Sequence, residues 1–297
     1  MSRPHGTYSI VALDPATGEL GAAVQSHWFS VGSLCTWARP GVGAVATQSV
    51  AEPAHGPHAL DRLAAGRDAA GALADVLAPD ALAAVRQVGV VDAHGQVAVH
   101  TGADCIPEAG HATGEHWTCQ ANMMARTTVP DAMSAAFAAA GGDLAERLMT
   151  ALESAEAEGG DVRGRQSAAL IVVPAKGEPW QTRVDLRVED HADPIGELRR
   201  LLGLQRAYDL AGEADGLMAA GDMDAAAEMY LRASGLAPES DELLFWAGLA
   251  IAQHGDVAAG ADAVRRAAQA HPGWLTLLER LSPEFAPAGE AVRNELG

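Results

Sequence analysis

The sequence predicts an α+β protein in two parts, with antiparallel sheets covered by helices to about residue 190 and an all-α helical repeat domain after it. Short runs of strand-forming residues come in pairs in the first part, and turn residues join the two runs of each pair. Ala- and Leu-rich helical stretches separate these pairs, which differs from the strict strand–helix alternation of a parallel nucleotide-binding fold. The last third of the chain repeats a residue pattern at a spacing of 34 residues.

The first two strands are predicted at Tyr8–Leu13 and Leu20–Ser26. They flank Asp14-Pro-Ala-Thr-Gly-Glu19, whose Pro and Gly are typical of a turn, so the pair should form a hairpin. Ala93-His-Gly95 marks the turn of a second hairpin. The remaining strands are predicted at Val42–Ser49, Gln87–Asp92, Gln96–Thr101, Trp117–Ala121, Ser167–Pro174 and Thr182–Val188.

Three helical stretches lie between these strands. The first runs over Pro57–Leu77 and is split near Gly66, and the second covers Val129–Ala140. The third covers Asp143–Glu158, where Asp143 has the spacing to Glu146 that a capping box requires. Leucines follow this cap at every fourth residue, which predicts one apolar helix face.

The repeat in the tail is carried by residues with helix-ending and helix-capping roles. Gly221-Asp222 recurs as Gly255-Asp256, and Pro238 recurs as Pro272. Gly ends the first helix of each unit, Asp caps the second, and Pro stops it. The period and the pattern resemble tetratricopeptide repeats, with an ordinary helical bundle as the alternative.

The predicted domains are residues 1–190 for the sheet-containing part and residues 195–285 for the tetratricopeptide-like helical repeat domain. The acidic segment Glu189–Pro194 is the predicted linker. Because two repeats alone bury little apolar surface, helices near Ile195–Leu204 and Trp274–Leu281 are expected to cap them.

Charge and cysteine content limit the partners and the compartment. The chain has 39 Asp and Glu against 20 Lys and Arg, a formal net charge of -19, so neither nucleic acid nor a membrane is an expected partner. No run approaches the roughly 18 apolar residues of a membrane span, and the first residues do not read as a signal peptide. Cys35, Cys105 and Cys119 are odd in number and widely spread, which predicts reduced thiols in the cytoplasm. Homo-oligomerisation stays open.

Two local patterns suggest a cofactor or a metal, and neither is convincing. Gly41-Val-Gly43-Ala-Val-Ala46 has the glycine spacing of a dinucleotide-binding loop, but strand-forming residues follow it where a helix is needed. No cofactor is therefore predicted. Cys105, His111, His116 and Cys119 are potential zinc ligands within fifteen residues, yet their spacings match no common zinc pattern. No metal site is predicted, and a zinc-dependent hydrolase stays a third alternative.

Thr7 stands directly before the first strand and directly after Gly6. A threonine hydroxyl needs a nearby base to become a nucleophile. If Thr7 were the first residue of the chain, its own α-amine could be that base, because such an amine has a reference pKa of about 7.7–8.0. This chemistry requires removal of Met1–Gly6. The ordinary alternative is a threonine that simply enters a strand.

Several stretches resemble the domain-of-unknown-function family 1028, which is similar in fold to Ntn (N-terminal nucleophile) hydrolases. Together they cover most of residues 7–190 in order. They are TYSIVALDPATGELGAAVQS (Thr7–Ser26), WARPGVGAVATQS (Trp37–Ser49), RQVGVVDAHGQVAVHTGADC (Arg86–Cys105) and GGDVRGRQSAALIVV (Gly159–Val173). The family has no settled activity.

The resemblance implies an Ntn-hydrolase-like αββα four-layer sandwich whose first strand presents a nucleophile for amide-bond hydrolysis. Thr7 matches that position at the head of the first strand. Members of the family commonly begin with Met-Thr, whereas five further residues separate Met1 from Thr7 here. A working nucleophile therefore implies cleavage between Gly6 and Thr7, or a start later than Met1.

The other candidate residues are assigned by chemical role. Ser26 is expected to bond the amine or hydroxyl of Thr7, and the Asn122 amide is expected to donate to a developing oxyanion. With Thr7 they form the predicted catalytic set. The predicted substrate-binding residues lie on a neighbouring strand or in a charged cluster before Ser167, and they are Thr47, Gln48, Asp161, Arg163 and Arg165.

The leading hypothesis is an Ntn-type amidohydrolase that acts on a small or peptide-like amide. The alternative is a catalytically inactive scaffold whose helical repeat tail binds a protein or cell-wall partner.

Overall fold

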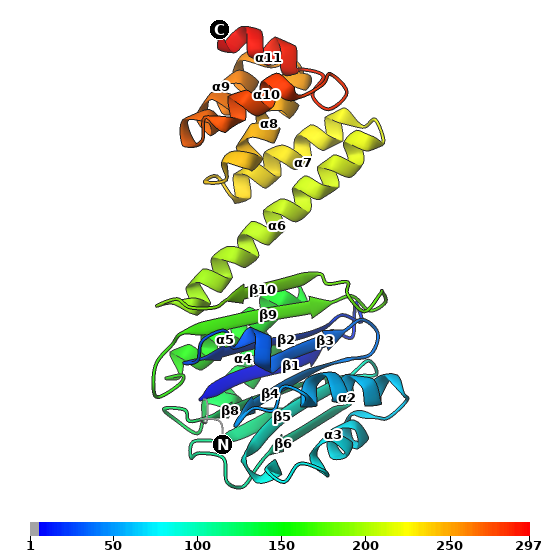
Figure 1. The fold of residues 1–297 in the computed structure, drawn as a ribbon, viewed down its shortest axis with the longest axis vertical. Coiled ribbons are helices and arrows are strands. Elements are labelled where there is room, and N and C mark those ends of the chain that lie inside the picture. The colour runs from blue at the N-terminus through cyan, green and yellow to red at the C-terminus, as the bar shows by residue number, and fades with distance from the viewer. Residues whose placement is uncertain (1–5) are drawn as a thin grey trace. The chain divides into compact units, whose positions relative to one another are not determined.

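A computed structural model of the 297-residue chain describes residues 6–297. Contacts between residues divide the chain into one unit over Met1–Arg199 and a second over Arg200–Gly297. The first contains both sheets and the second is helical (Figure 1). The predicted α+β class is confirmed, whereas the predicted domain limits of 1–190 and 195–285 stay a prediction.

A six-stranded antiparallel sheet forms the larger layer of the first unit. Its order is β10-β9-β2-β1-β8-β7, so β1 is an interior strand with a neighbour on either side. Every adjacent pair is antiparallel, and the hairpin predicted from the turn at residues 14–19 is the β1–β2 pair. The strands are β1 (Thr7–Leu13), β2 (Leu20–Ser26), β7 (Gly110–Thr113), β8 (Trp117–Asn122), β9 (Ser167–Val173) and β10 (Val184–Val188).

A four-stranded antiparallel sheet forms the other layer, in the order β3-β4-β5-β6. It is built from β3 (Thr36–Arg39), β4 (Gly43–Ser49), β5 (Arg86–Asp92) and β6 (Val97–Thr101). Small and β-branched residues dominate β4 and β5, and both strands are buried along their whole length. Such strands need cover on both faces.

The two sheets pack face to face through apolar side chains. Val11 and Leu20 of the larger sheet lie in one buried cluster with Ala44 and Val91 of the smaller sheet. Helices α2 (His55–Ala64) and α3 (Ala69–Leu77) cover the outer face of the smaller sheet, as Figure 1 shows. Helices α4 (Val129–Ala139) and α5 (Leu144–Ala157) cover the larger sheet. The result is four layers in the order helix, sheet, sheet, helix. Two short elements complete the unit, α1 (Gly32–Cys35) and the 3-10 turn η1 (Ala83–Val85).

Helix α5 forms where the capping pattern predicts it. The Asp143 carboxylate accepts a hydrogen bond from the Glu146 backbone N–H at 2.8 Å. Leu144, Leu148 and Leu152 are fully buried on one face of the helix, against the sheet. Cap and apolar face together fix the start and the orientation of this helix.

The second unit contains helices only. Helices α7 and α9 both begin after a capping aspartate, Asp222 and Asp256, and each carboxylate accepts the N–H of the residue three positions later. This repeats the predicted 34-residue spacing, while the assignment to tetratricopeptide-like repeats stays a prediction. The elements are α6 (Pro194–Ala219, which begins in the first unit), α7 (Met223–Leu236), α8 (Asp241–Gln253), α9 (Val257–Ala270), α10 (Gly273–Arg280) and α11 (Gly289–Leu296).

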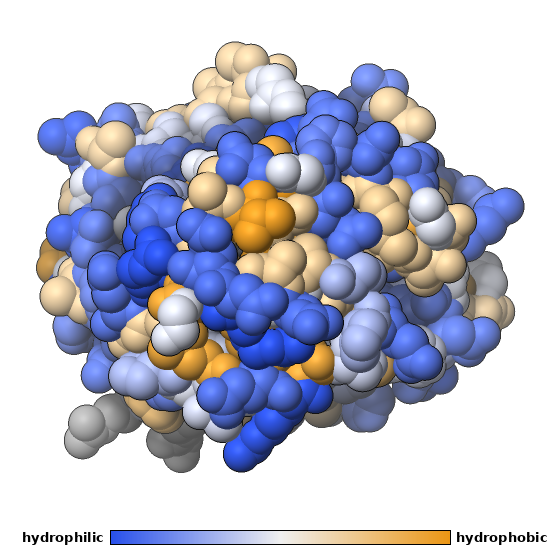
Figure 2. Space-filling model, turned by 90° about the horizontal axis from the view of Figure 1, so that it is seen from above, coloured by the Kyte–Doolittle hydropathy of each residue, from blue (hydrophilic) through white to orange (hydrophobic). Residues whose placement is uncertain are grey.

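Across residues 6–297, no helix combines the length and the apolar character that crossing a bilayer requires. On the face that Figure 2 shows, hydrophobic side chains form small patches separated by hydrophilic ones.

Candidate functional site

Thr7 lies at the head of β1 and has a strand on either side. It is in register with Ser26 on β2 and with Asn122 on β8. All three side chains are fully buried. The antiparallel pairing explains the meeting, because the start of β1 must lie beside the ends of both neighbouring strands. The structure therefore brings together the three predicted catalytic residues.

The carbonyl oxygen of Gly6 is held by two donors. Ser26 Oγ donates to it at 2.6 Å, and Arg163 Nη2 donates at 2.9 Å. The Thr7 hydroxyl in turn donates to Ser26 Oγ at 3.1 Å. A chain of hydrogen bonds thus runs from the Thr7 hydroxyl through Ser26 to the carbonyl of the preceding peptide bond.

Asp161 fixes Arg163 in this position. Its carboxylate accepts from Arg163 Nη2 at 2.8 Å and from Nε at 3.1 Å, and its side chain is fully buried. It also accepts from the backbone N–H of His27 at 3.2 Å, which ties it to the end of β2. Since both carboxylate oxygens are engaged, the guanidinium is held in one orientation.

A layer of amide side chains holds the carbonyl of Thr7. Gln48 Nε2 donates to Thr7 O at 3.1 Å and to Gln87 Oε1 at 2.8 Å. Asn122 Nδ2 donates to the same two oxygens, at 3.4 Å and 3.0 Å. Ser9 connects the layer further, because its Oγ donates to Gln48 at 2.6 Å. The Asn122 amide thus donates to Thr7 O, whereas the donors to Gly6 O are Ser26 and Arg163. Asn122 Oδ1 is buried and has no partner among residues 6–297.

Two residues with strained backbone follow this layer directly. Ser49 has φ of 69° and comes after Gln48, and Met123 has φ of 57° and comes after Asn122. Residues other than glycine seldom adopt such angles, and strained residues cluster at active and ligand sites. Each of the two amide side chains that bind the Thr7 carbonyl is therefore followed by a strained residue, at the end of β4 or directly after β8.

Two of the predicted substrate-binding residues lie elsewhere. Thr47 donates its hydroxyl to the Glu52 carbonyl, because alternate residues of β4 face opposite sides and Gln48 takes the inward side. Arg165 pairs with Glu156 at 3.4 Å and with Asp193 at 3.0 Å. The structure brings Gln48, Asp161 and Arg163 to Thr7 and Gly6, but not these two.

Ser9, Gln87 and Gln120 also belong to the amide layer and were missed in the sequence analysis. Gln120 donates to Ser9 at 2.7 Å, and Gln87 also donates to the Ala121 carbonyl at 2.9 Å. All three side chains are fully buried. Polar residues at alternate positions of strands that are otherwise apolar were the available signal.

The residues considered as zinc ligands do not form a metal site. Cys119 is buried on β8, and burial raises the pKa of its thiol. His111 bonds Thr101 at 2.9 Å, and His116 lies 3.2 Å from the Gly95 carbonyl. Within the described chain, no three His, Cys, Asp or Glu side chains are placed to share a metal ion.

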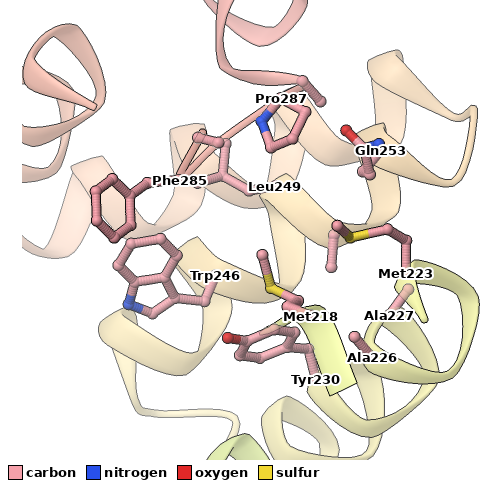
Figure 3. Close-up of a pocket in the computed structure, with 13 residues that line it drawn as sticks. Met218, Met223, Ala226, Ala227, Tyr230, Trp246, Leu249, Gln253, Phe285 and Pro287 are labelled. Atoms are coloured by element: carbon pink, nitrogen blue, oxygen red, sulfur yellow. The ribbon is translucent and has the colours of Figure 1, made fainter. Parts of the chain in front are cut away.

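The helical tail contains two hollows. Figure 3 shows the first, a cavity of about 30 Å³, which is room for about one water molecule. Its lining is mostly apolar and includes Met218, Met223, Tyr230, Trp246 and Phe285. The second has a volume of about 620 Å³ and is lined by four carboxylates, those of Asp222, Asp224, Glu228 and Asp256.

Comparison with known proteins identifies the chain by family. A protein from Silicibacter pomeroyi, SPO2555, has a crystal structure that is similar, with a TM-score of 0.61 and 32% sequence identity. The match covers 66% of this chain and 84% of that protein, which is described as a member of DUF1028. No curated protein matches. Residues 7–198 match the model of the same family, which is described as one of unknown function. The chain therefore belongs to the family of unknown function DUF1028.

Proposed function

We propose that this protein is an N-terminal-nucleophile amidohydrolase that frees its nucleophile by cutting the bond between Gly6 and Thr7. One observation carries the proposal. The carbonyl oxygen of that bond is held by two donors, and the hydroxyl that would attack the bond is hydrogen-bonded to one of them. Donors placed where negative charge develops are the main source of catalysis in acyl transfer. The four-layer arrangement agrees with the fold that the resemblance implies.

The cleavage step needs only the groups described. Thr7 Oγ1 bonds to the Gly6 carbonyl carbon while its proton passes to Ser26 Oγ and the Ser26 proton passes to the Gly6 oxygen. The carbon–nitrogen bond then breaks, and that proton moves to the Thr7 nitrogen, which leaves an ester between Gly6 and Thr7 Oγ1. Water hydrolyses the ester to a Gly6 carboxylate, a Thr7 hydroxyl and a free α-amine.

In the shortened chain, the same threonine supplies nucleophile and base. Its amine, with a reference pKa of about 7.7–8.0, takes the hydroxyl proton as Thr7 Oγ1 attacks a substrate amide, so no cofactor enters the proposal. Gln48 and Asn122 hold the Thr7 carbonyl and so orient the nucleophile. Asp161 and Arg163 face the space that Gly6 fills before cleavage.

The proposal places the enzyme in the cytoplasm. Cys35, Cys105 and Cys119 are free cysteines. Burial raises the pKa of Cys35 to about 12, so this thiol stays protonated and unreactive at neutral pH. A reducing compartment suits a chain with these thiols.

The mature N-terminus tests the proposal. On incubation of the purified full chain, intact mass spectrometry should show conversion to a form that begins at Thr7. A Thr7→Val variant, which keeps the β-branched shape but lacks the hydroxyl, should retain the preceding residues indefinitely. Thr7→Ser, which keeps a hydroxyl, should still be processed. A wild-type chain that never loses Met1–Gly6, or a Thr7→Val chain that loses them equally fast, would refute the proposal.

The second candidate function is a scaffold whose tail binds a protein or cell-wall partner. The acidic hollow of about 620 Å³ supports it, because four carboxylates there favour a basic partner. Between residues 209 and 256 the tail has ten Asp and Glu residues and one Lys or Arg, Arg232. Retention of Met1–Gly6 by the wild-type chain would favour this function over hydrolysis.

A further inference from the structure

The residue before Thr7 fills the space that the acyl part of a substrate amide must enter. In both reactions the attacking atom is Thr7 Oγ1, and Ser26 Oγ and Arg163 Nη2 are the donors that meet the carbonyl oxygen. Both reactions pass through an ester on Thr7 Oγ1, so the acyl carbon of a substrate comes to lie beside Thr7 Oγ1, in the space around the Gly6 carbonyl. The next carbon of the acyl group then lies in the space around Gly6 Cα.

Asp161 leaves no room for a branch at that carbon. A Cβ built on Gly6 would lie 2.7 Å from Asp161 Oδ2 and 2.9 Å from both Cγ and Oδ1. Carbon and carboxylate atoms do not approach this closely without a shift of one of them. All three contacts are with one side chain, so its freedom to move decides the outcome.

The Asp161 carboxylate is held from several directions. Arg163 donates to it from its backbone N–H at 2.9 Å, from Nε at 3.1 Å and from Nη2 at 2.8 Å. The backbone N–H of His27, the residue directly after β2, also donates to it at 3.2 Å. A bridge between Met124 and Asp161 also fixes the backbone here. Moving the carboxylate aside would break bonds that orient Arg163, one of the two donors to the reacting carbonyl.

We infer, on the basis of the proposed function, that Asp161 makes the site select against acyl groups with an L-configured branch on the carbon next to the scissile carbonyl. The substrate class is then amides of glycine-like acyl groups, of the form CH2–CO–NH. Because Arg163 neutralises the carboxylate, selection acts through shape rather than through charge on the acyl group. L-Alanyl and larger L-aminoacyl amides are poor substrates.

A double-mutant cycle on self-cleavage tests the role of Asp161. The cycle compares the same Gly6→Ala change in two backgrounds, so an effect of alanine on the backbone alone is the same in both. Gly6→Ala should slow conversion, followed by intact mass spectrometry, by about 10- to 100-fold. In an Asp161→Ala background, the same Gly6→Ala change should slow conversion by less than about threefold. An equal effect of Gly6→Ala in both backgrounds, or none in either, overturns the inference.

A second measurement covers the case in which Asp161→Ala abolishes cleavage. A chain expressed with Met directly before Thr7 should, after removal of that Met, hydrolyse N-acetylglycine 4-nitroanilide with a kcat/KM about 10- to 100-fold above that for the N-acetyl-L-alanine analogue. Equal kcat/KM values for the two anilides overturn the inference. If neither anilide is hydrolysed, the self-cleavage rate of the Gly6→Ala chain decides. A wild-type chain that never cleaves refutes the proposed function, whereas cleavage of Gly6→Ala at the wild-type rate refutes the selectivity alone.

Discussion

A Ser26→Ala chain should release its first six residues about 100- to 1,000-fold more slowly than the wild-type chain, which is the usual loss when one oxyanion donor is removed. Ser26 Oγ donates to the Gly6 carbonyl at 2.6 Å and accepts from the Thr7 hydroxyl at 3.1 Å. Alanine removes both bonds, so the carbonyl keeps Arg163 as its remaining described donor and the Thr7 hydroxyl loses its hydrogen bond to Ser26. The rate is obtained from a time course of intact mass.

Ser167→Ala is the matched control. Ser167 is fully buried, faces Ser26 across the β2–β9 pair, and donates its hydroxyl to the Trp28 carbonyl rather than to Gly6. We expect its processing rate to stay within a few-fold of the wild-type rate. If the two alanine variants slow cleavage equally, Ser26 acts through folding of the sheet and not through the reacting bond.

A Gln48→Leu chain should lose about 2–4 kcal/mol of unfolding free energy in the sheet-containing unit, since several buried groups lose a partner at once. Gln48 accepts from Ser9 at 2.6 Å and donates to Thr7 O and to Gln87. Leucine keeps the volume and removes these bonds. Urea denaturation followed by circular dichroism measures the change.

Gln25→Leu on β2 provides the comparison. Gln25 is also fully buried, but neither atom of its amide has a partner within residues 6–297. Leucine at this position removes no hydrogen bond and relieves an unpaired polar group, so its unfolding free energy should equal or exceed that of the wild-type chain. A loss at Gln25 as large as the loss at Gln48 would mean that the changed shape of the side chain, not the loss of hydrogen bonds, explains both.

The meeting of Thr7 and Ser26 could be predicted because it is local. The turn at residues 14–19 joins the two strands, so the start of β1 must lie opposite the end of β2. Asn122 is 115 residues from Thr7, and nothing in the sequence determines that β8 takes the other side of β1. Its place among the candidates depended on its position after a strand.

The sequence does not show which residues of β4 point between the two sheets. All seven residues of this strand are buried, so no alternation of polar and apolar residues distinguishes Thr47 from Gln48. The amide of Gln48 fits between the sheets because its hydrogen-bond partners come from two other strands, Ser9 and the Thr7 carbonyl from β1 and Gln87 from β5. Short strands were also missed: β3 and β7 have four residues each, and Gly and His in β7 give no strand pattern.

The layer of neutral side chains around Thr7 has a consequence for titration. The partners described for this residue are one hydroxyl and two carboxamides, and neither kind of group ionises between about pH 2 and pH 12. An enzyme that relies on a histidine or a carboxylate as base shows the ionisation of that side chain. Under the proposed function, the rising limb of a profile of kcat/KM against pH instead follows the Thr7 α-amine that cleavage frees. Acetylating this amine should remove the limb together with the activity.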